Sequence, residues 1–494
     1  MDAGNSWLFC NGEETLSLKS SALSGIKWTT LSTVAQTGIQ LAQLAILARL
    51  LEPSDFGLMA IMMIVIGFSQ AFMDMGISNA IIHRQNITHD QLSSLYWLNL
   101  SSGLVLFAVV AAISPLVGLF YREPRITEPM LLLSFVFVIV ALGNQYRILC
   151  QKELQFNKMA KIDITASVSS FIVAVVLAVY GYGVYALVVA RLTESSMSSI
   201  LFLAVGLKEH HRPKLIYRHA DLKGFYQFGL YQMAERSINY ISANFDKLII
   251  GKMLGIQAVG FYNMAWQLII FPLAKINPIL NRVTFPVYAK VQNDSVALNR
   301  YYSFSVKTLS LVTVPLLAFL SFFAADVVLF VFGEGWETSA TLVTVLAFVG
   351  ILKALGNPGG AIILAKGRAD VGFWWNMIWA VLVVGVIYGV LTLVPQVEVV
   401  PYVLLALSLT IGMIWHWIVA RIASIAYGPI VIHFAKIIII SFIITGVSFV
   451  LITSLNLERV LSRLAVGGTL CAAIYLPYLF FFEREILKHL QREK

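Results

Sequence analysis

The chain has 494 residues, of which 59% are hydrophobic and only 12% are charged, whereas about 25% of the residues in an ordinary soluble domain are charged. Its net charge of +9 is spread over many separate segments and not gathered in one domain, which argues against nucleic-acid binding. No GxxxxGK[ST], CxxC or HExxH motif occurs, and Cys10, Cys150 and Cys471 fit neither a disulfide framework nor a metal-ligand spacing. This composition excludes a soluble globular protein and predicts a polytopic helical membrane protein.

The first residues, 1–23, are expected to form a cytoplasmic N-terminal segment. They are polar, carry Glu13 and Glu14, and lack the basic region of a cleaved signal peptide. The first apolar span then serves as the insertion signal.

Apolar stretches of about 20 residues, each long enough to cross a hydrocarbon core, recur along nearly the whole chain. They predict an all-α fold with about fourteen transmembrane helices. The predicted helices are 24–50, 56–80, 92–120, 129–150, 162–181, 184–206, 223–252, 256–283, 304–331, 338–365, 371–394, 400–424, 430–454 and 460–482.

Lys and Arg are concentrated in alternate connections between the predicted spans, roughly three to one over the remaining connections. Because cytoplasmic loops carry this excess, both termini are predicted to be cytoplasmic in a bacterial plasma (inner) membrane. The longest basic connection, "LKEHHRPKLIYRHADLKG" at 207–224, lies between the sixth and seventh helices and divides the chain.

Two halves on either side of this connection resemble each other. "ARLLEPSDFGLMA" at 48–60 aligns with "GKMLGIQAVGFYN" at 251–263, which places Gly57 opposite Gly260, and "ALGN" occurs at 141–144 and again at 354–357. Six spans separate the copies, and an even number preserves orientation, so the repeats are parallel, as in many secondary transporters. The predicted parts are an N-lobe at 24–206, a cytoplasmic linker at 207–223, a C-lobe at 224–427, helices 13 and 14 at 428–482, and a cytoplasmic tail at 483–494.

One face of the predicted seventh helix is polar, because its polar residues recur at spacings of three, four and seven. They are Gln232, Glu235, Arg236, Asn239, Ser242 and Asp246, and the equivalent stripe in the first helix is Thr29, Thr33, Gln36, Gln40 and Gln43. Charged groups within a membrane normally face protein or a wet cavity. Singly, Gln36, Gln40 and Asn239 are as well explained by helix-to-helix hydrogen bonds, but the repeated stripe favours a shared cavity.

Further charged residues lie within or at the ends of other predicted spans. They are Asp74, Arg147, Arg191, Glu194, Lys275, Arg282 and Lys353. Cations outnumber carboxylates in this set, which favours an anionic ligand such as a phosphate group. The alternative for Arg147 and Arg282 is that they anchor helix ends by reaching the membrane surface.

Carboxylates in the same regions offer sites for a coupling Na⁺ or H⁺, and no other cofactor is expected. The candidates are Asp74, Glu194, Glu235 and Asp246. His210 and His211 lie in the basic linker, where we expect a solvated pair in preference to a metal site.

Several stretches carry a resemblance to a known family. "DKLIIGKMLGIQAVGFYNMAWQL", "FPLAKINPILNRVTFPVYAK", "LARLLEPSDFGLMAI" and "DMGISNAIIHR" resemble polysaccharide-type members of the multidrug/oligosaccharidyl-lipid/polysaccharide exporter superfamily. "LYWLN" at 95–99 and "QKELQFNK" at 151–158 are most similar to the colanic-acid-type Wzx flippases. The resemblance covers about residues 20–480.

This resemblance implies two six-helix lobes plus two C-terminal helices, which move an undecaprenyl-pyrophosphate-linked oligosaccharide across the plasma membrane by alternating access. It implies a cationic cavity for the pyrophosphate and the sugars. A polysaccharide polymerase and a chain-length regulator are expected partners. The matching motif positions are Asp74, Arg147, Asp246, Lys275 and Arg282, whereas Arg191, Arg236 and Lys353 are candidates from the residue pattern alone.

Two other functions remain open at the level of sequence. A drug exporter of the same superfamily would favour carboxylates and aromatic residues in its cavity, against the excess of Lys and Arg seen here. A membrane polysaccharide polymerase or ligase would need larger and more polar outer loops than this chain provides.

Overall fold

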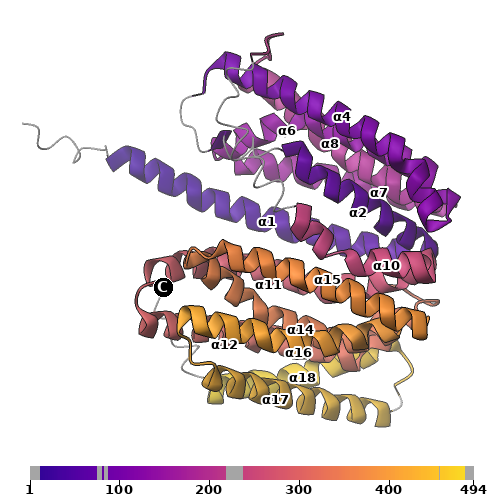
Figure 1. The fold of residues 1–494 in the computed structure, drawn as a ribbon, viewed down its shortest axis with the longest axis vertical. Coiled ribbons are helices and arrows are strands. Elements are labelled where there is room, and N and C mark those ends of the chain that lie inside the picture. The colour runs from indigo at the N-terminus through magenta and orange to yellow at the C-terminus, as the bar shows by residue number, and fades with distance from the viewer. Residues whose placement is uncertain (1–11, 75–80, 83–86, 219–236, 456, 484–494) are drawn as a thin grey trace, which may run out of the picture. The chain divides into compact units, whose positions relative to one another are not determined.

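The structure is a computed structural model that describes residues 12–74, 81–82, 87–218, 237–455 and 457–483 (Figure 1). Within these ranges, side chains are described except at 12–23, 26, 74, 278–283 and 482. The described residues are mostly helical and contain no strand, so the predicted all-α fold is confirmed. Thirteen described helices are long and apolar enough to span a membrane.

The chain forms two compact units, and each is described here by itself. Unit 1 holds the described residues of Met1–Glu52 and Met62–Ile241, and unit 2 those of Pro53–Ile61 and Ser242–Lys494. One of the boundaries between the units lies inside the helix Pro53–Asp74, after Ile61. The predicted lobe boundaries at 206 and 224 stay a prediction.

Unit 1 is built from the first helices of the chain, except that the start of α2, Pro53–Ile61, belongs to unit 2. They are α1 Gly12–Leu50, α2 Pro53–Asp74, α4 His89–Tyr121, η1 Pro124–Ile126, α5 Thr127–Ser134, α6 Val136–Lys152, α7 Phe156–Val179 and α8 Val184–Glu209. Helix α7 packs against α1 and α8, and α6 packs against α8 and α4. Their core includes the fully buried Tyr146 and Leu95, with Phe202 of α8 beside them.

Unit 2 holds the remaining helices. They are α10 Phe245–Leu254, α11 Ile256–Lys290, α12 Ser295–Phe322, α13 Ala324–Val331, α14 Glu337–Ala365, α15 Ala369–Leu393, α16 Val399–Ala423, α17 Tyr427–Ser454 and α18 Val460–Phe482. Helix α14 packs against α11, α12 and α16, and it is the most buried of the membrane-spanning helices described in this unit. Outside this core, Arg463 of α18 forms an ion pair of 3.2 Å with the buried Asp326 of α13.

Local sequence explains several helix ends. Thr88 and Gln91 form a reciprocal capping box at the start of α4, and Asp294 accepts two backbone N–H groups at the start of α12. Gly255 separates α10 from α11 with a φ of +87°, a left-handed value that favours glycine. Arg122 takes a left-handed conformation to close α4.

The predicted spans agree with the structure in position, with four differences. Helix α1 begins at Gly12, inside the segment predicted at 1–23 and well before the predicted helix start at 24. The span predicted at 129–150 is divided at Phe135 into α5 and α6, and the one at 304–331 is divided at Phe323 into α12 and α13. The first part of the seventh predicted helix, 223–236, falls outside the described residues; its described part, 237–252, is interrupted by a turn at 243–244 before α10 begins. The count of fourteen spans therefore stays a prediction.

The two glycines that the repeat pairs are in mutual contact within unit 2. A Cβ on Gly57 would lie 2.0 Å from the carbonyl oxygen of Ile256, and a Cβ on Gly260 would lie 1.8 Å from the carbonyl oxygen of Pro53. Pro53 and Ile256 begin α2 and α11 and share the offset of 203 that relates the glycines. The contact is reciprocal, as a two-fold relation between duplicated helices requires.

Candidate functional site

Unit 1 contains a cavity of about 470 Å³ among five of its helices, α1, α2, α6, α7 and α8. The residues that line it are Gln36, Gln70, Met73, Val140, Gly143, Asn144, Arg147, Asp163, Ala166, Arg191, Glu194, Ser195, Ser198, Ser199 and Phe202. Most of them are polar or small, which is unusual for the interior of a membrane-spanning bundle. A cavity of this kind suits a polar ligand.

Small residues shape the wall between α6 and α8. A Cβ on Gly143 would lie 2.5 Å from Cα of Ser199 and 2.7 Å from its carbonyl oxygen, so the two helix backbones are in close contact there. Three serines of α8, Ser195, Ser198 and Ser199, line the same wall. Small residues at helix interfaces allow this approach and leave room beside it for larger polar side chains.

Arg147 of α6 is held by a carboxylate of the neighbouring α7. Its Nη2 donates to Oδ2 of Asp163 at 3.1 Å, and its guanidinium carbon lies 5.5 Å from the centre of the Phe202 ring. The Arg147 side chain is 45% exposed, whereas Asp163 is 17% exposed. Arg147 is therefore oriented by its partners and still accessible from the cavity.

A second arginine pair lies on α8. Nη1 of Arg191 donates to Oε2 of Glu194, one turn later, at 2.8 Å, and both side chains are about one-third exposed. Nε of Arg191 is buried without a hydrogen-bond partner among the described residues. Since guanidinium carries five N–H donors in a planar fork, both arginines keep donors for a ligand.

The cavity therefore carries two cations and two carboxylates. This arrangement differs from the excess of cations predicted for the whole set of intramembrane charges, because Asp163 was not among the candidates. Its sequence signal was a carboxylate inside the predicted span 162–181, near the basic start of that helix. An anionic ligand could replace the carboxylates on the arginines, since both types of anion use the same donor fork.

A separate charged cluster lies in unit 2. Asp246, at 9% exposure, accepts a hydrogen bond of 2.6 Å from the hydroxyl of Tyr262 and another of 2.8 Å from the backbone N–H of Lys247. Nζ of Lys247 donates to Oδ1 of Asn244 at 3.3 Å. Asp246 also interacts electrostatically with Lys247 and with Lys353 of α14. Asp246 is therefore the carboxylate that neutralises its cationic neighbours in the otherwise apolar segment 239–255.

Lys353 is the accessible cation of this cluster. It lies in the middle of α14, its side chain is exposed, and its Nζ is 4.5 Å from the centre of the buried Trp266 ring. A cation this close to the face of tryptophan is stabilised without losing access to a ligand. Lys275 of α11 is half-buried, with Nζ 5.7 Å from the ring of Phe271.

The structure thus brings together part of the predicted site. Arg147, Arg191, Glu194 and Gln36 line the unit 1 cavity; Asp246 and Lys353 belong to the unit 2 cluster. Gln40 and Asn239 are exposed and are not among the residues that line the cavity.

Four predicted residues are not placed. Glu235 and Arg236 lie outside the described residues, and Asp74 and Arg282 are described by their backbone alone, in α2 and α11.

The expectation for the two linker histidines is wrong, since both side chains are buried. His211 is 7% exposed and lies beside Tyr146, whose hydroxyl donates to the His211 carbonyl at 3.3 Å. Burial, together with the neighbouring His89 and His210, lowers the pKa of His211 to about 4. The physical reason is tertiary packing: a polar linker that docks on a unit need not be solvated.

His210 is held between two side chains of unit 1. Its Nδ1 lies 3.1 Å from Oε1 of Glu153, and its Nε2 lies 3.6 Å from Sγ of Cys150. Cys150 is fully buried, so no substrate reaches its sulfur, and the arrangement is structural. No metal-binding group of three or more His, Cys, Asp or Glu side chains occurs in the part of the chain that the structure describes.

Comparison with known proteins places the chain in a family. Residues 46–341 match the profile of the family described as "Polysaccharide biosynthesis protein". The teichuronic acid biosynthesis protein TuaB of Bacillus subtilis (strain 168) is 36% identical over 360 residues, 73% of this chain and 74% of that protein. The lipopolysaccharide biosynthesis protein WzxC of Escherichia coli (strain K12) is 34% identical over 362 residues, 73% of each chain.

A solved structure shows the same fold. The lipid II flippase MurJ, in an inward closed conformation, matches with a TM-score of 0.72 over 94% of this chain and 100% of that one, at 14% sequence identity. The resemblance inferred from the residues is confirmed by these matches. The chain belongs to the polysaccharide biosynthesis protein family and has the fold of a multi-pass membrane transporter.

Proposed function

We propose that this protein is a flippase that moves undecaprenyl-pyrophosphate-linked oligosaccharide repeat units across the plasma membrane by alternating access. The observation that carries the proposal is the cavity of unit 1, in which Arg147 and Arg191 are each held by a carboxylate and keep free donors. The printed names of the relatives, which concern teichuronic acid and lipopolysaccharide biosynthesis, support a polysaccharide precursor as the cargo.

The pyrophosphate group fits the chemistry of the arginine pairs. Two guanidinium groups in one cavity match a ligand with two linked phosphates, because each phosphate accepts a two-pronged hydrogen bond. Asn144 and the serines of α8 offer donors and acceptors for sugar hydroxyls. The polyprenyl chain stays in the bilayer, since it is apolar along its whole length.

The carboxylates give the cycle a way to couple to an ion. When a phosphate takes the donors of Arg147, Asp163 loses its partner and becomes a site for H⁺ or Na⁺. Glu194 stands in the same relation to Arg191. In unit 2, the accessible Lys353 and its neighbour Asp246 supply a second cation and carboxylate. The transport cycle proposed here requires no other cofactor.

We place the protein in the bacterial inner membrane with both termini in the cytoplasm, as the distribution of Lys and Arg favours. A polysaccharide polymerase and a chain-length regulator are its proposed partners, because a translocated repeat unit must be assembled after transport. The carboxylates that a drug exporter would need for organic cations are, in this cavity, each paired with an arginine, Asp163 with Arg147 and Glu194 with Arg191, so they do not favour that function. The family match likewise gives no support to a polymerase or ligase activity.

The test is flipping of a fluorescent undecaprenyl-pyrophosphate oligosaccharide in proteoliposomes. We expect transport by the wild type and at least a tenfold loss in Arg147→Gln/Arg191→Gln at matched reconstitution. Arg125→Gln is the matched control, because Arg125 pairs with Glu123 between α4 and α5, away from the cavity. A well-folded wild type that moves no such lipid would contradict the proposed function, and normal transport by the double variant would contradict the cavity assignment.

A further inference from the structure

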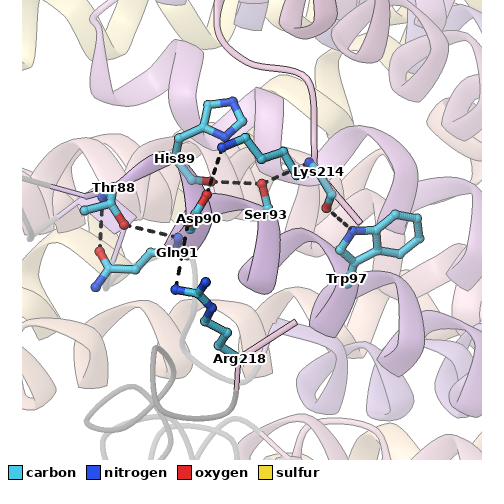
Figure 2. Close-up of polar contacts among 8 residues, drawn as sticks. All are labelled: Thr88, His89, Asp90, Gln91, Ser93, Trp97, Lys214 and Arg218. Atoms are coloured by element: carbon cyan, nitrogen blue, oxygen red, sulfur yellow. Dashed lines mark hydrogen bonds and ion pairs between the residues drawn. The ribbon is translucent and has the colours of Figure 1, made fainter. Parts of the chain in front are cut away.

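The linker that follows α8 is fastened along the start of α4, as Figure 2 shows. The Trp97 indole N–H donates to the Lys214 carbonyl at 2.8 Å, and the hydroxyl oxygen of Ser93 accepts from the Lys214 N–H at 3.1 Å. The hydroxyl oxygen of Ser94 accepts from the Arg218 N–H at 3.2 Å. The backbone of this segment is therefore fixed in one register on unit 1.

Two large apolar side chains of this fixed segment are exposed on the surface of unit 1. Leu215 is 88% exposed and Tyr217 is 53% exposed, although the residues around them are held by hydrogen bonds. Together with Ile216, Trp97 and Ser101 they line an open groove of about 340 Å³. We call this groove the linker groove. Exposed apolar side chains on an ordered segment are typical of a surface that contacts a membrane or a partner.

The linker groove continues into an apolar stripe of α4. Trp97, Ser101, Val105 and Val109 follow one another at intervals of four residues. Val105 is 61% exposed and Val109 is 48% exposed. Residues at this spacing share one face of a helix, and α4 is a candidate membrane span. In the bilayer this stripe contacts acyl chains, so the groove opens onto the path of a lipid tail.

The polar end of the linker groove is basic. Nζ of Lys214 lies 3.1 Å from Oδ1 of Asp90, and Nη1 of Arg218 lies 4.0 Å from its Oδ2 (Figure 2). One carboxylate thus serves two cations, and the Lys214 and Arg218 side chains remain 56% and 63% exposed. Lys208 and Arg212, both exposed, add further positive charge to the same segment.

We propose that the linker groove binds an anionic glycerophospholipid of the surrounding bilayer. Lys214 and Arg218 hold the phosphate, Leu215 and Tyr217 cover the glycerol and the first methylene groups, and an acyl chain follows the Val105 and Val109 stripe. Clusters of basic residues beside an apolar membrane segment attract anionic headgroups. The site is separate from the transport cavity, which shares no lining residue with it.

Charge and apolar contact together select this partner. A zwitterionic lipid would gain only the apolar contact, and a soluble anion only the basic one. A bilayer phospholipid is also present at high local concentration beside any membrane span. Occupancy of the groove holds residues 214–218 of the linker at the membrane surface.

Native mass spectrometry of the full-length protein in detergent tests the proposal, with dioleoylphosphatidylglycerol and dioleoylphosphatidylcholine as probes. We expect the wild type to bind the phosphatidylglycerol at least tenfold more tightly. Lys214→Gln/Arg218→Gln should weaken its binding by about 30-fold, since each basic residue near an anionic headgroup contributes about fivefold. Leu215→Ser/Tyr217→Ser should weaken both lipids, and none of the hydrogen bonds that fasten the linker uses these two side chains.

A matched control lies at the start of α12, where Val296 is 80% exposed and Arg300 is exposed. Val296→Ser/Arg300→Gln changes the same kinds of side chain and should leave lipid binding unaltered. Equal affinity for the two lipids in the wild type, or unchanged affinity in both test variants, would overturn the proposal. Stoichiometric displacement of the phosphatidylglycerol by undecaprenyl pyrophosphate would also overturn it, because the groove would then be a substrate site.

Discussion

At the scale of single residues, the cavity of unit 1 is held neutral by pairing. An arginine left alone inside a membrane protein is costly, and a partner carboxylate removes most of that cost. Arg147 has Asp163, and Arg191 has Glu194. A ligand phosphate therefore competes with a resident carboxylate, and the strength of that competition can be measured.

Asp163→Asn is expected to tighten binding of the lipid-linked pyrophosphate by about five- to tenfold. The reason is that Arg147 no longer has to give up an ion pair with a charged partner when it binds phosphate. In this half-exposed pair, the ion pair contributes roughly 1 kcal/mol. Turnover should fall, because the released carboxylate that accepts the coupling ion is missing. Equilibrium binding of a fluorescent substrate by detergent-solubilised protein, followed by the flipping assay, checks both parts. Unchanged binding and normal flipping would show that Asp163 does not compete.

The candidate site shows where reading single residues reaches its limit. The sequence predicts Arg147, Arg191 and Glu194, because a charge within an apolar span costs free energy and is normally paired or functional. Asp163 was missed since its partner lies sixteen positions away on another helix, and no sequence period joins the two. Gln40 was included by the same polar spacing as Gln36, although only Gln36 lines the cavity.

At the scale of elements, the linker is a packed part of unit 1. The polarity of "KEHHRPKLIYR" at 208–218 predicts solvation, but its histidines are buried and its backbone is fixed on α4. The division of the span 304–331 at Phe323 was equally hidden, because no glycine or proline marks it. Hydropathy locates the membrane spans, whereas the docking of the linker and the interruption of a helix depend on tertiary contacts.

Docking of the linker is expected to weaken as pH falls from about 6.5 towards 4. The pKa of His211 in the docked state is about 4, below the value of about 6.5 for an exposed imidazole, so in this window only the undocked segment binds the proton. Undocking is then favoured by up to about 3 kcal/mol at pH 4. Hydrogen exchange of the amides at 211–218, corrected for intrinsic rates, should show protection lost in acid.

His211→Gln supplies the control for that experiment, because glutamine keeps a polar side chain and does not titrate in this range. Protection in this variant should vary less with pH than in the wild type. Equal pH dependence in the two proteins would contradict the assignment of the effect to His211.

The crossing of α2 and α11 gives a second test at this scale. Gly57→Ala and Gly260→Ala each place a Cβ against a backbone carbonyl and should destabilise unit 2 by about 1–3 kcal/mol. Gly385→Ala in α15, where nothing lies within 4 Å, should be neutral or stabilising by up to about 1 kcal/mol. Thermal unfolding in one detergent compares the three, and equal melting temperatures would mean that the crossing relaxes without cost.

At the scale of the whole molecule, the duplication explains why equivalent positions meet. The aligned pair Gly57 and Gly260 was visible in the sequence, and the structure shows that each lies against the first residue of the other's helix. The charged sites do not follow the repeat, because Arg147 aligns with Gly360 at the offset of 213 that relates the "ALGN" segments. Duplication therefore explains the packing of equivalent helices, whereas the charged residues of the two halves have diverged.

Orientation in the membrane is the remaining expectation at this scale. Roughly three-quarters of the loop Lys and Arg lie on the side that also holds the linker, so that side should be cytoplasmic. Green fluorescent protein fused to the C-terminus should then fluoresce, and alkaline phosphatase fused after Gln396, between α15 and α16, should be active. Three predicted spans lie between these two points, and an odd number places them on opposite sides. The reverse pattern of activity would invert the topology and put the basic linker groove against the outer leaflet.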